Sequence, residues 1–180
     1  MILPAPLLRR LATDARGMAL VEFAILLPVM LTLFLGGFQL SQASACKRRV
    51  TITARTLSDL VSQYQAMAVS DVTTVLDASA QIMAPFDTSA MKSRVSMIKV
   101  DGNRAVTVMW SEARNDTALV NGAAYTGLPD AMKIANSYYV LGEVTYNYSP
   151  VSGRFAYPMT FTQTLFMVPR KSAYVDCPTC

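Results

Sequence analysis

One long apolar segment near the N-terminus limits what this chain can fold into. The sequence from Met18 to Phe38 consists of apolar or small residues except for Glu22 and Thr32. At about 1.5 Å of rise per residue, an α-helix of this length spans the roughly 30 Å hydrocarbon core of a bilayer. We therefore expect a single transmembrane helix over residues 18–40.

The carboxylate of Glu22 needs a physical explanation, because an acid at mid-bilayer costs about 2.5–3.5 kcal/mol on insertion scales. In an uncut chain Glu22 lies near Arg16, so that it could reach the headgroups or take up a proton. If the chain is instead cut after Gly17, the new α-amine of Met18 can neutralise Glu22 of the same or a neighbouring subunit. The residues alone leave both explanations open.

The residues around this position also form a motif, made of Arg16-Gly17, Val21-Glu22-Phe23-Ala24 and Leu27-Pro28. The motif resembles the class III signal of type IV pilins and pseudopilins, and most of all the signal of TadE-like minor pilins of the Flp (Tad) tight-adherence pilus. Later blocks resemble the soluble part of that family: Leu57-Ser58-Asp59-Leu60-Val61-Ser62-Gln63, Trp110-Ser111, the segment from Glu143 to Pro150, and Val168-Pro169-Arg170. TadF-like proteins fit as well, whereas TadG-like relatives carry a large extra domain for which 180 residues leave no room.

The resemblance implies a structural subunit that acts in assembly or initiation of the pilus. Residues 1–17 would be a leader that prepilin peptidase removes between Gly17 and Met18, while Glu22 and Phe23 would act in subunit assembly. Residues 41–180 would form a periplasmic α+β pilin-like domain on an inner-membrane anchor that can enter the extracellular pilus. The implied partners are other minor pilins, the major Flp pilin, prepilin peptidase, the inner-membrane assembly platform and membrane lipid. An uncut single-pass protein with a periplasmic binding domain is the alternative.

Hydrophobic spacing predicts two helices. The first continues beyond the membrane to about Met67, because apolar residues recur every three, four or seven positions from Val50 onward. The second runs from Asp71 to about Met83 with Ser70 as its N-cap, and Pro85 ends it.

Alternating residues then predict an antiparallel sheet of about four strands packed on the long helix. Residues 95–100 and 105–110 flank a turn over residues 101–104, which is typical of a β-hairpin. Residues 115–130 read as a loop, and strands follow over residues 139–148 and 160–168, with a turn over 149–158 between them. The alternation of Val144, Tyr146 and Tyr148 predicts that one side of its strand is packed.

No catalytic, metal or cofactor site is expected, because the chain has no histidine. The net charge of +4 is too small to indicate nucleic-acid binding. Cys177 and Cys180 form a C-x-x-C pair after which no helix follows, so we expect a disulfide in the tail rather than a thiol oxidoreductase. Cys46 is then either a buried free thiol or an inter-subunit contact. The sequence before Cys46, from Ala43, also weakly resembles a signal-peptidase or lipoprotein cleavage site.

Overall fold

The computed structural model describes residues 17–150 and 158–180 of the chain. It divides into two compact units, Met1–Gln42 and Ala43–Cys180. The expected leader lies outside the described residues except for Gly17, and most of the expected turn over 149–158 lies outside them too. One long helix, α2 (Met18–Ser62), contributes to both units, and the units are described separately.

In the first unit, α2 is apolar and mostly exposed. Its most apolar window has a mean hydropathy of 2.4, and none of this window is buried within the chain. Pro28 lies inside the helix, and the hydroxyl of Thr32 donates a hydrogen bond to the Pro28 carbonyl at 2.7 Å. One helix of the described residues is thus long and apolar enough to cross a membrane, which indicates a single-pass membrane protein.

The second unit holds a four-stranded sheet with the order β2-β1-β3-β4, in which every neighbouring pair is antiparallel. The strands are β1 (Met91–Val100), β2 (Val106–Arg114), β3 (Tyr138–Tyr148) and β4 (Met159–Met167). The hairpin turn between β1 and β2 is closed by the carboxylate of Asp101, which accepts hydrogen bonds from the amides of Asn103 and Ala105. The prediction of an α+β fold with a long helix, a short helix and four antiparallel strands is confirmed.

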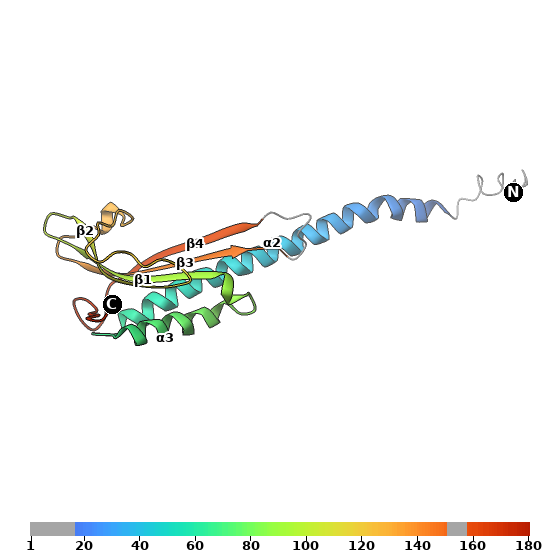
Figure 1. Cartoon of the computed structure of the whole chain (residues 1–180). Coiled ribbons are helices and arrows are strands. Elements are labelled where there is room, and N and C mark those ends of the chain that lie inside the picture. The colour runs from blue at the N-terminus through green and yellow to red at the C-terminus, as the bar shows by residue number, and fades with distance from the viewer. Residues whose placement is uncertain (1–16, 151–157) are drawn as a thin grey trace, which may run out of the picture. The chain divides into compact units, whose positions relative to one another are not determined.

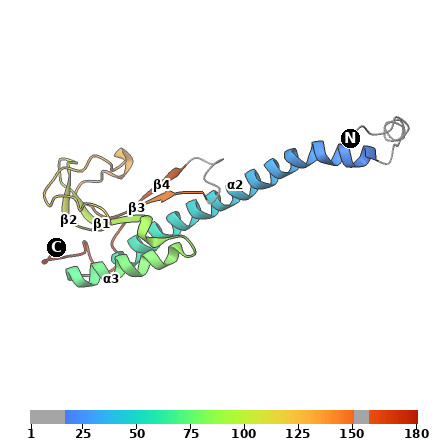
Figure 2. The same cartoon turned by 45° about the vertical axis from the view of Figure 1, so that its right-hand side comes forward.

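Both helices of this unit cover one face of the sheet, as Figures 1 and 2 show. The C-terminal part of α2 buries a stripe of residues spaced by three and four positions: Ala43, Cys46, Val50, Ala54, Leu57 and Val61. Val144, Tyr146 and Tyr148 of β3 are buried on the same side, so their predicted packing is confirmed. The thiol of Cys46 is free and fully buried here.

The sequence-based end of α2 was wrong by about one turn, because the helix stops at Ser62 rather than near Met67. The C-terminal tail takes the place of the missing turn. The amide of Arg170 donates to the carbonyl of Ser62 at 2.9 Å, and the amide of Met67 donates to the carbonyl of Asp176 at 2.8 Å. These long-range bonds satisfy backbone groups that a longer helix would have paired internally.

The second helix, α3 (Val69–Ala80), also begins earlier than expected. Its N-cap is Ala68 and not Ser70, because two other side chains satisfy the first amides. The carboxylate of Asp71 accepts the amide hydrogen of Ala68 at 3.0 Å, and the hydroxyl of Thr179 accepts that of Val69 at 3.1 Å. The helix ends at Ala80 and a 3-10 turn, η2 (Gln81–Met83), follows before Pro85.

A long connection between β2 and β3 covers part of the other face of the sheet. It contains the short 3-10 turn η4 (Asp130–Met132), and it buries Leu128 against a second core formed by residues of β1, β2 and β3. Arg94 of β1 fixes the start of this connection, because its guanidinium pairs with Glu143 of β3 and donates to the carbonyl of Thr117 at 2.9 Å. The loop predicted over residues 115–130 therefore packs on part of this face of the sheet.

Candidate functional site

The expected processing and assembly residues lie together at the start of α2. Gly17 directly precedes the helix, and Met18 is the first residue of the helix. Glu22 and Phe23 follow about one helical turn later, and all four residues are exposed. The structure thus places the predicted cleavage bond at the N-terminal end of α2, and among the described residues nothing lies within 4 Å of a Cβ added at Gly17.

The relation between Met18 and Glu22 follows from helix geometry. Residues four apart lie on one face of an α-helix, one turn from each other. An α-amine on Met18 would therefore lie on the same face as the Glu22 carboxylate. A helix N-terminus itself carries a partial positive charge, which also favours a carboxylate within the first turns. This segment can consequently hold an ion pair, within one chain or between two chains.

The surface around Glu22 is otherwise apolar. Met18, Leu20 and Phe23 are 69%, 74% and 58% exposed, respectively, in the described chain. Burial of such a surface removes apolar groups from water, and lipid or the apolar helices of other subunits can both provide it. This apolar surface can therefore associate with lipid or with apolar helices of other subunits, and Glu22 is the charged group within it.

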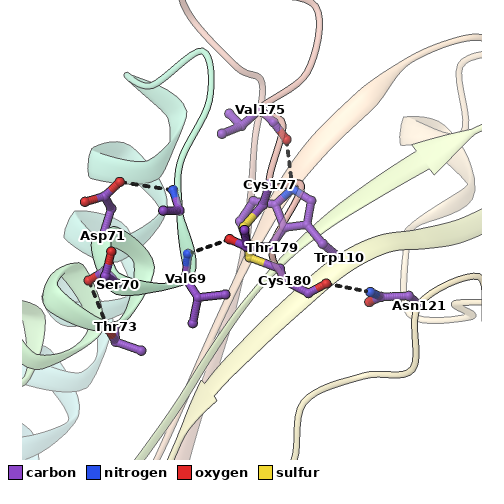
Figure 3. The surroundings of a disulfide bond; sticks show 11 residues. Val69, Ser70, Asp71, Thr73, Trp110, Asn121, Val175, Cys177, Thr179 and Cys180 are labelled. Carbon is purple, nitrogen blue, oxygen red and sulfur yellow. Dashed lines mark hydrogen bonds between the residues drawn. A yellow bond between two sulfur atoms is a disulfide. The ribbon is translucent and has the colours of Figure 1, made fainter.

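The second predicted site is the C-terminal cysteine pair. Cys177 and Cys180 are joined by a disulfide with a Cα–Cα distance of 5.5 Å. Cys177 is only 6% exposed and belongs to the main core, together with Val175. Figure 3 shows the disulfide beside Trp110, whose indole nitrogen donates to the carbonyl of Val175 at 2.8 Å.

The disulfide loop connects three parts of the second unit. Thr179 accepts the amide of Val69 at the start of α3, and the side chain of Asn121 in the long connection donates to the carbonyl of Cys180 at 3.2 Å. Trp110 belongs to β2, so its hydrogen bond to Val175 attaches the tail to the sheet as well. These contacts together hold the C-terminal tail against the rest of the second unit. A thiol nucleophile needs exposure and a group that lowers its pKa, and the buried Cys177 is placed for packing instead.

Sequence reasoning missed two residues that determine how the second unit packs. Thr179 was not recognised, because a hydroxyl that caps a helix more than one hundred positions earlier in the chain leaves no local signal. Gly142 was not recognised either, although a glycine inside a strand indicates a close approach of another backbone. A Cβ at Gly142 would overlap the hydroxyl of Ser58 on α2.

Comparison with models of protein families gives a match at the N-terminal end of the described chain. The model of the family described as TadE-like protein matches residues 17–57. No curated protein and no solved structure matches the chain. The matched segment begins at the predicted cleavage site and covers most of α2, but it does not include the sheet. The matched segment is less than half of the chain, and over residues 17–57 the chain is similar to TadE-like proteins, as its N-terminal motif predicted.

Proposed function

We propose that this chain is a minor pilin, or pseudopilin, of an Flp (Tad) pilus and that it acts as a structural subunit in pilus assembly or initiation. Prepilin peptidase would cut it after Gly17, and the mature chain would remain in the inner membrane with its second unit in the periplasm. The observation that supports this most is a carboxylate, Glu22, one turn inside the exposed apolar part of a helix that matches the TadE-like family over residues 17–57. Such a helix can move from lipid into a bundle of pilin helices because both surroundings are apolar.

The first experiment measures the intact mass of the chain from membranes of a host that has prepilin peptidase. We expect a mature chain that starts at Met18. Gly17→Leu should abolish this cut, because the peptidase requires the glycine while the structure leaves open space around Gly17. Gly36→Leu is the matched control, since Gly36 also has nothing within 4 Å of an added Cβ. An uncut chain in the unaltered protein would favour a permanent single-pass anchor instead.

The second experiment tests the role of the carboxylate. Glu22→Gln keeps the size and shape of the side chain and removes its charge. We expect Glu22→Gln to be inserted in the membrane and cut normally but to be lost from pilus assembly, because the terminal amine of the neighbouring subunit then has no partner. Normal assembly by Glu22→Gln would contradict the proposed role, and it would point to a protein that works as an anchored periplasmic binding domain.

A further inference from the structure

The described part of the second unit contains a pocket between α2 and the sheet that the assembly role does not use. It has a volume of about 230 Å³ and is lined by Lys47, Val50 and Thr51 of α2 and by residues 160–163 of β4. Strand β4 is at the edge of the sheet, where β3 is its one neighbour among the described strands. Among the described residues, the outer edge of β4 therefore has main-chain groups that pair with no neighbouring strand.

The two edges of the sheet differ in this respect. The β2 edge is covered by residues of the long connection, since the amides of Gly122 and Tyr125 donate to the carbonyls of Val108 and Val106. On β4 the hydroxyls of Thr160 and Thr162 are engaged with Asn147 and Thr145 of β3. The Thr51 hydroxyl is engaged as well, because it donates to the carbonyl of Lys47 at 3.2 Å and lies 3.4 Å from the side-chain oxygen of Gln163. Among the described residues, the Lys47 ammonium and main-chain amides of β4 are the donors that remain for a ligand in the pocket.

Lys47 is the cation that lines the pocket, and the charge on the adjoining part of α2 is one-sided. Lys47, Arg48 and Arg55 are exposed, and the helical spacing puts them on one side of α2 together with Thr51. No acidic residue occurs in the sequence between Glu22 and Asp59. Within the described residues no ion pair neutralises these three cations. Arg49 points elsewhere, because its guanidinium donates to the carbonyl of Ile82 at 3.3 Å.

A pocket lined by a cation can bind an anion, and the position of this pocket along α2 indicates which kind of anion it would meet. Lys47 lies about two helical turns after Leu40, where the apolar stretch ends. Clusters of Lys and Arg directly beside a membrane span attract anionic lipids, by about 1 kcal/mol for each cation. We propose that the pocket between α2 and β4 binds the phosphodiester headgroup of an anionic phospholipid, with Lys47 as the cation that contacts the phosphate. This inference requires α2 to be inserted in a membrane, but it does not depend on the pilus role.

The test uses the full chain in nanodiscs of equimolar phosphatidylcholine and phosphatidylglycerol. Native mass spectrometry after release measures how much phosphatidylglycerol each chain retains. We expect enrichment of this lipid on the unaltered chain and a loss of roughly fivefold in Lys47→Gln, as removal of one cation near the surface implies. The control Arg49→Gln removes the same charge from a different face of α2. It should lose clearly less lipid than Lys47→Gln, because Arg49 does not line the pocket and its guanidinium donates to the carbonyl of Ile82. An equal loss in both variants would mean general charge attraction and would overturn the site.

A second measurement locates the ligand. Hydrogen exchange at the amides of residues 160–163 should be slower in the mixed nanodiscs than in pure phosphatidylcholine. Equal protection by inorganic phosphate in pure phosphatidylcholine would assign the pocket to a soluble anion. Protection that appears only when two chains share a nanodisc would mean that the open edge of β4 pairs with a second chain. Either of these results, or unchanged exchange, would overturn the lipid site.

Discussion

At the residue scale, the contact between helix and sheet depends on one position without a side chain. Gly142 lies in the middle of β3, opposite Val95 on β1 and Leu165 on β4. Its missing Cβ leaves room for Ser58 of α2, whose hydroxyl donates to the Ala54 carbonyl at 3.0 Å. The backbone of the helix thus approaches the sheet more closely than any larger residue would allow.

Gly142→Ala should lower the free energy of unfolding by about 1–3 kcal/mol, because overpacking shifts a buried backbone. A Cβ there would overlap the Ser58 hydroxyl and come within 3.2 Å of the Ala54 carbonyl oxygen. Adding Ser58→Ala should restore part of the loss, since the two positions are in direct contact. Urea unfolding of the chain in detergent measures both effects.

Gly102→Ala is the control for this substitution. Gly102 is in the β1–β2 turn, and an added Cβ there meets nothing within 4 Å. Its free energy of unfolding should stay within about 0.5 kcal/mol of the unaltered chain. If Gly142→Ala were equally harmless, the close approach of α2 to β3 would be contradicted.

At the element scale, the C-terminal tail acts as a secondary-structure partner for segments far away in sequence. It pairs with residues 65–67 after α2 through Asp176, and it covers Trp110 of β2 through Val175. The ion pair between Arg170 and Asp59 adds a contact at the start of the tail. The disulfide closes a very short ring, so its effect on the whole chain should be local.

Replacing both Cys177 and Cys180 by Ser should release the tail without unfolding the sheet. The chain-entropy estimate for so short a ring is at most about 2 kcal/mol. Trp110 is the single tryptophan of the chain, and its emission should shift to the red when its contact with the Val175 carbonyl loosens. A reductant should shift the emission of the unaltered chain in the same way and leave the double variant unchanged. Emission that does not respond in either case would contradict the proposed role of the disulfide, which is to hold the tail against Trp110.

The long connection between β2 and β3 gives a prediction on pH. Burial raises the pKa of Tyr125 to about 12, with a further rise from Glu143 and an opposing effect from Arg94. The phenol ionises near 10 in an unfolded chain, so the stability from neutral Tyr125 is present below about pH 10 and is lost as the pH approaches 12.

Tyr125→Phe should therefore make the loss of stability between about pH 10 and 12 less steep. The fall should not vanish, because burial also raises the pKa values of Tyr146 and Tyr148. Unfolding midpoints in urea across this range measure the slope for both proteins. Identical slopes would mean that Tyr125 is equally accessible in the folded and unfolded chain.

At the scale of the whole molecule, the two units have different environments. Both hydrophobic cores draw all their members from residues 43–180, whereas the apolar window of α2 in the first unit buries none of its surface within the chain. The second unit can thus satisfy its own apolar surface, while the first unit needs lipid or other subunits.

A fragment of residues 43–180 should accordingly be soluble and unfold in one cooperative transition. Its circular dichroism should show the mixed helix and sheet content of the second unit. The matching measurement is thermal unfolding of the full chain in detergent, which should give a similar midpoint for the sheet. A fragment without a cooperative transition would show that the second unit depends on the first.

Most of the fold could be predicted because it is encoded in local patterns. The apolar run defined the exposed part of α2, and the alternation in β3 defined its buried side. The residues of the N-terminal site were also visible, since Gly17, Met18, Glu22 and Phe23 lie in one short motif that the family match covers. Their processing and assembly roles stay predictions until the cleavage and assembly experiments are done.

The parts that sequence did not predict are those in which distant segments compete for the same backbone groups. The sequence by itself determined the apolar helix, the hairpin turn at Asp101 and the strand faces, because each depends on residues that are neighbours in the chain. Only the tertiary structure decided that α2 ends at Ser62, that Thr179 caps α3 and that β4 is the edge strand of the described sheet and lies beside Lys47. The reason is that a backbone hydrogen bond satisfied from far away has the same energy as a local one, and only the folded chain brings the distant partner within reach.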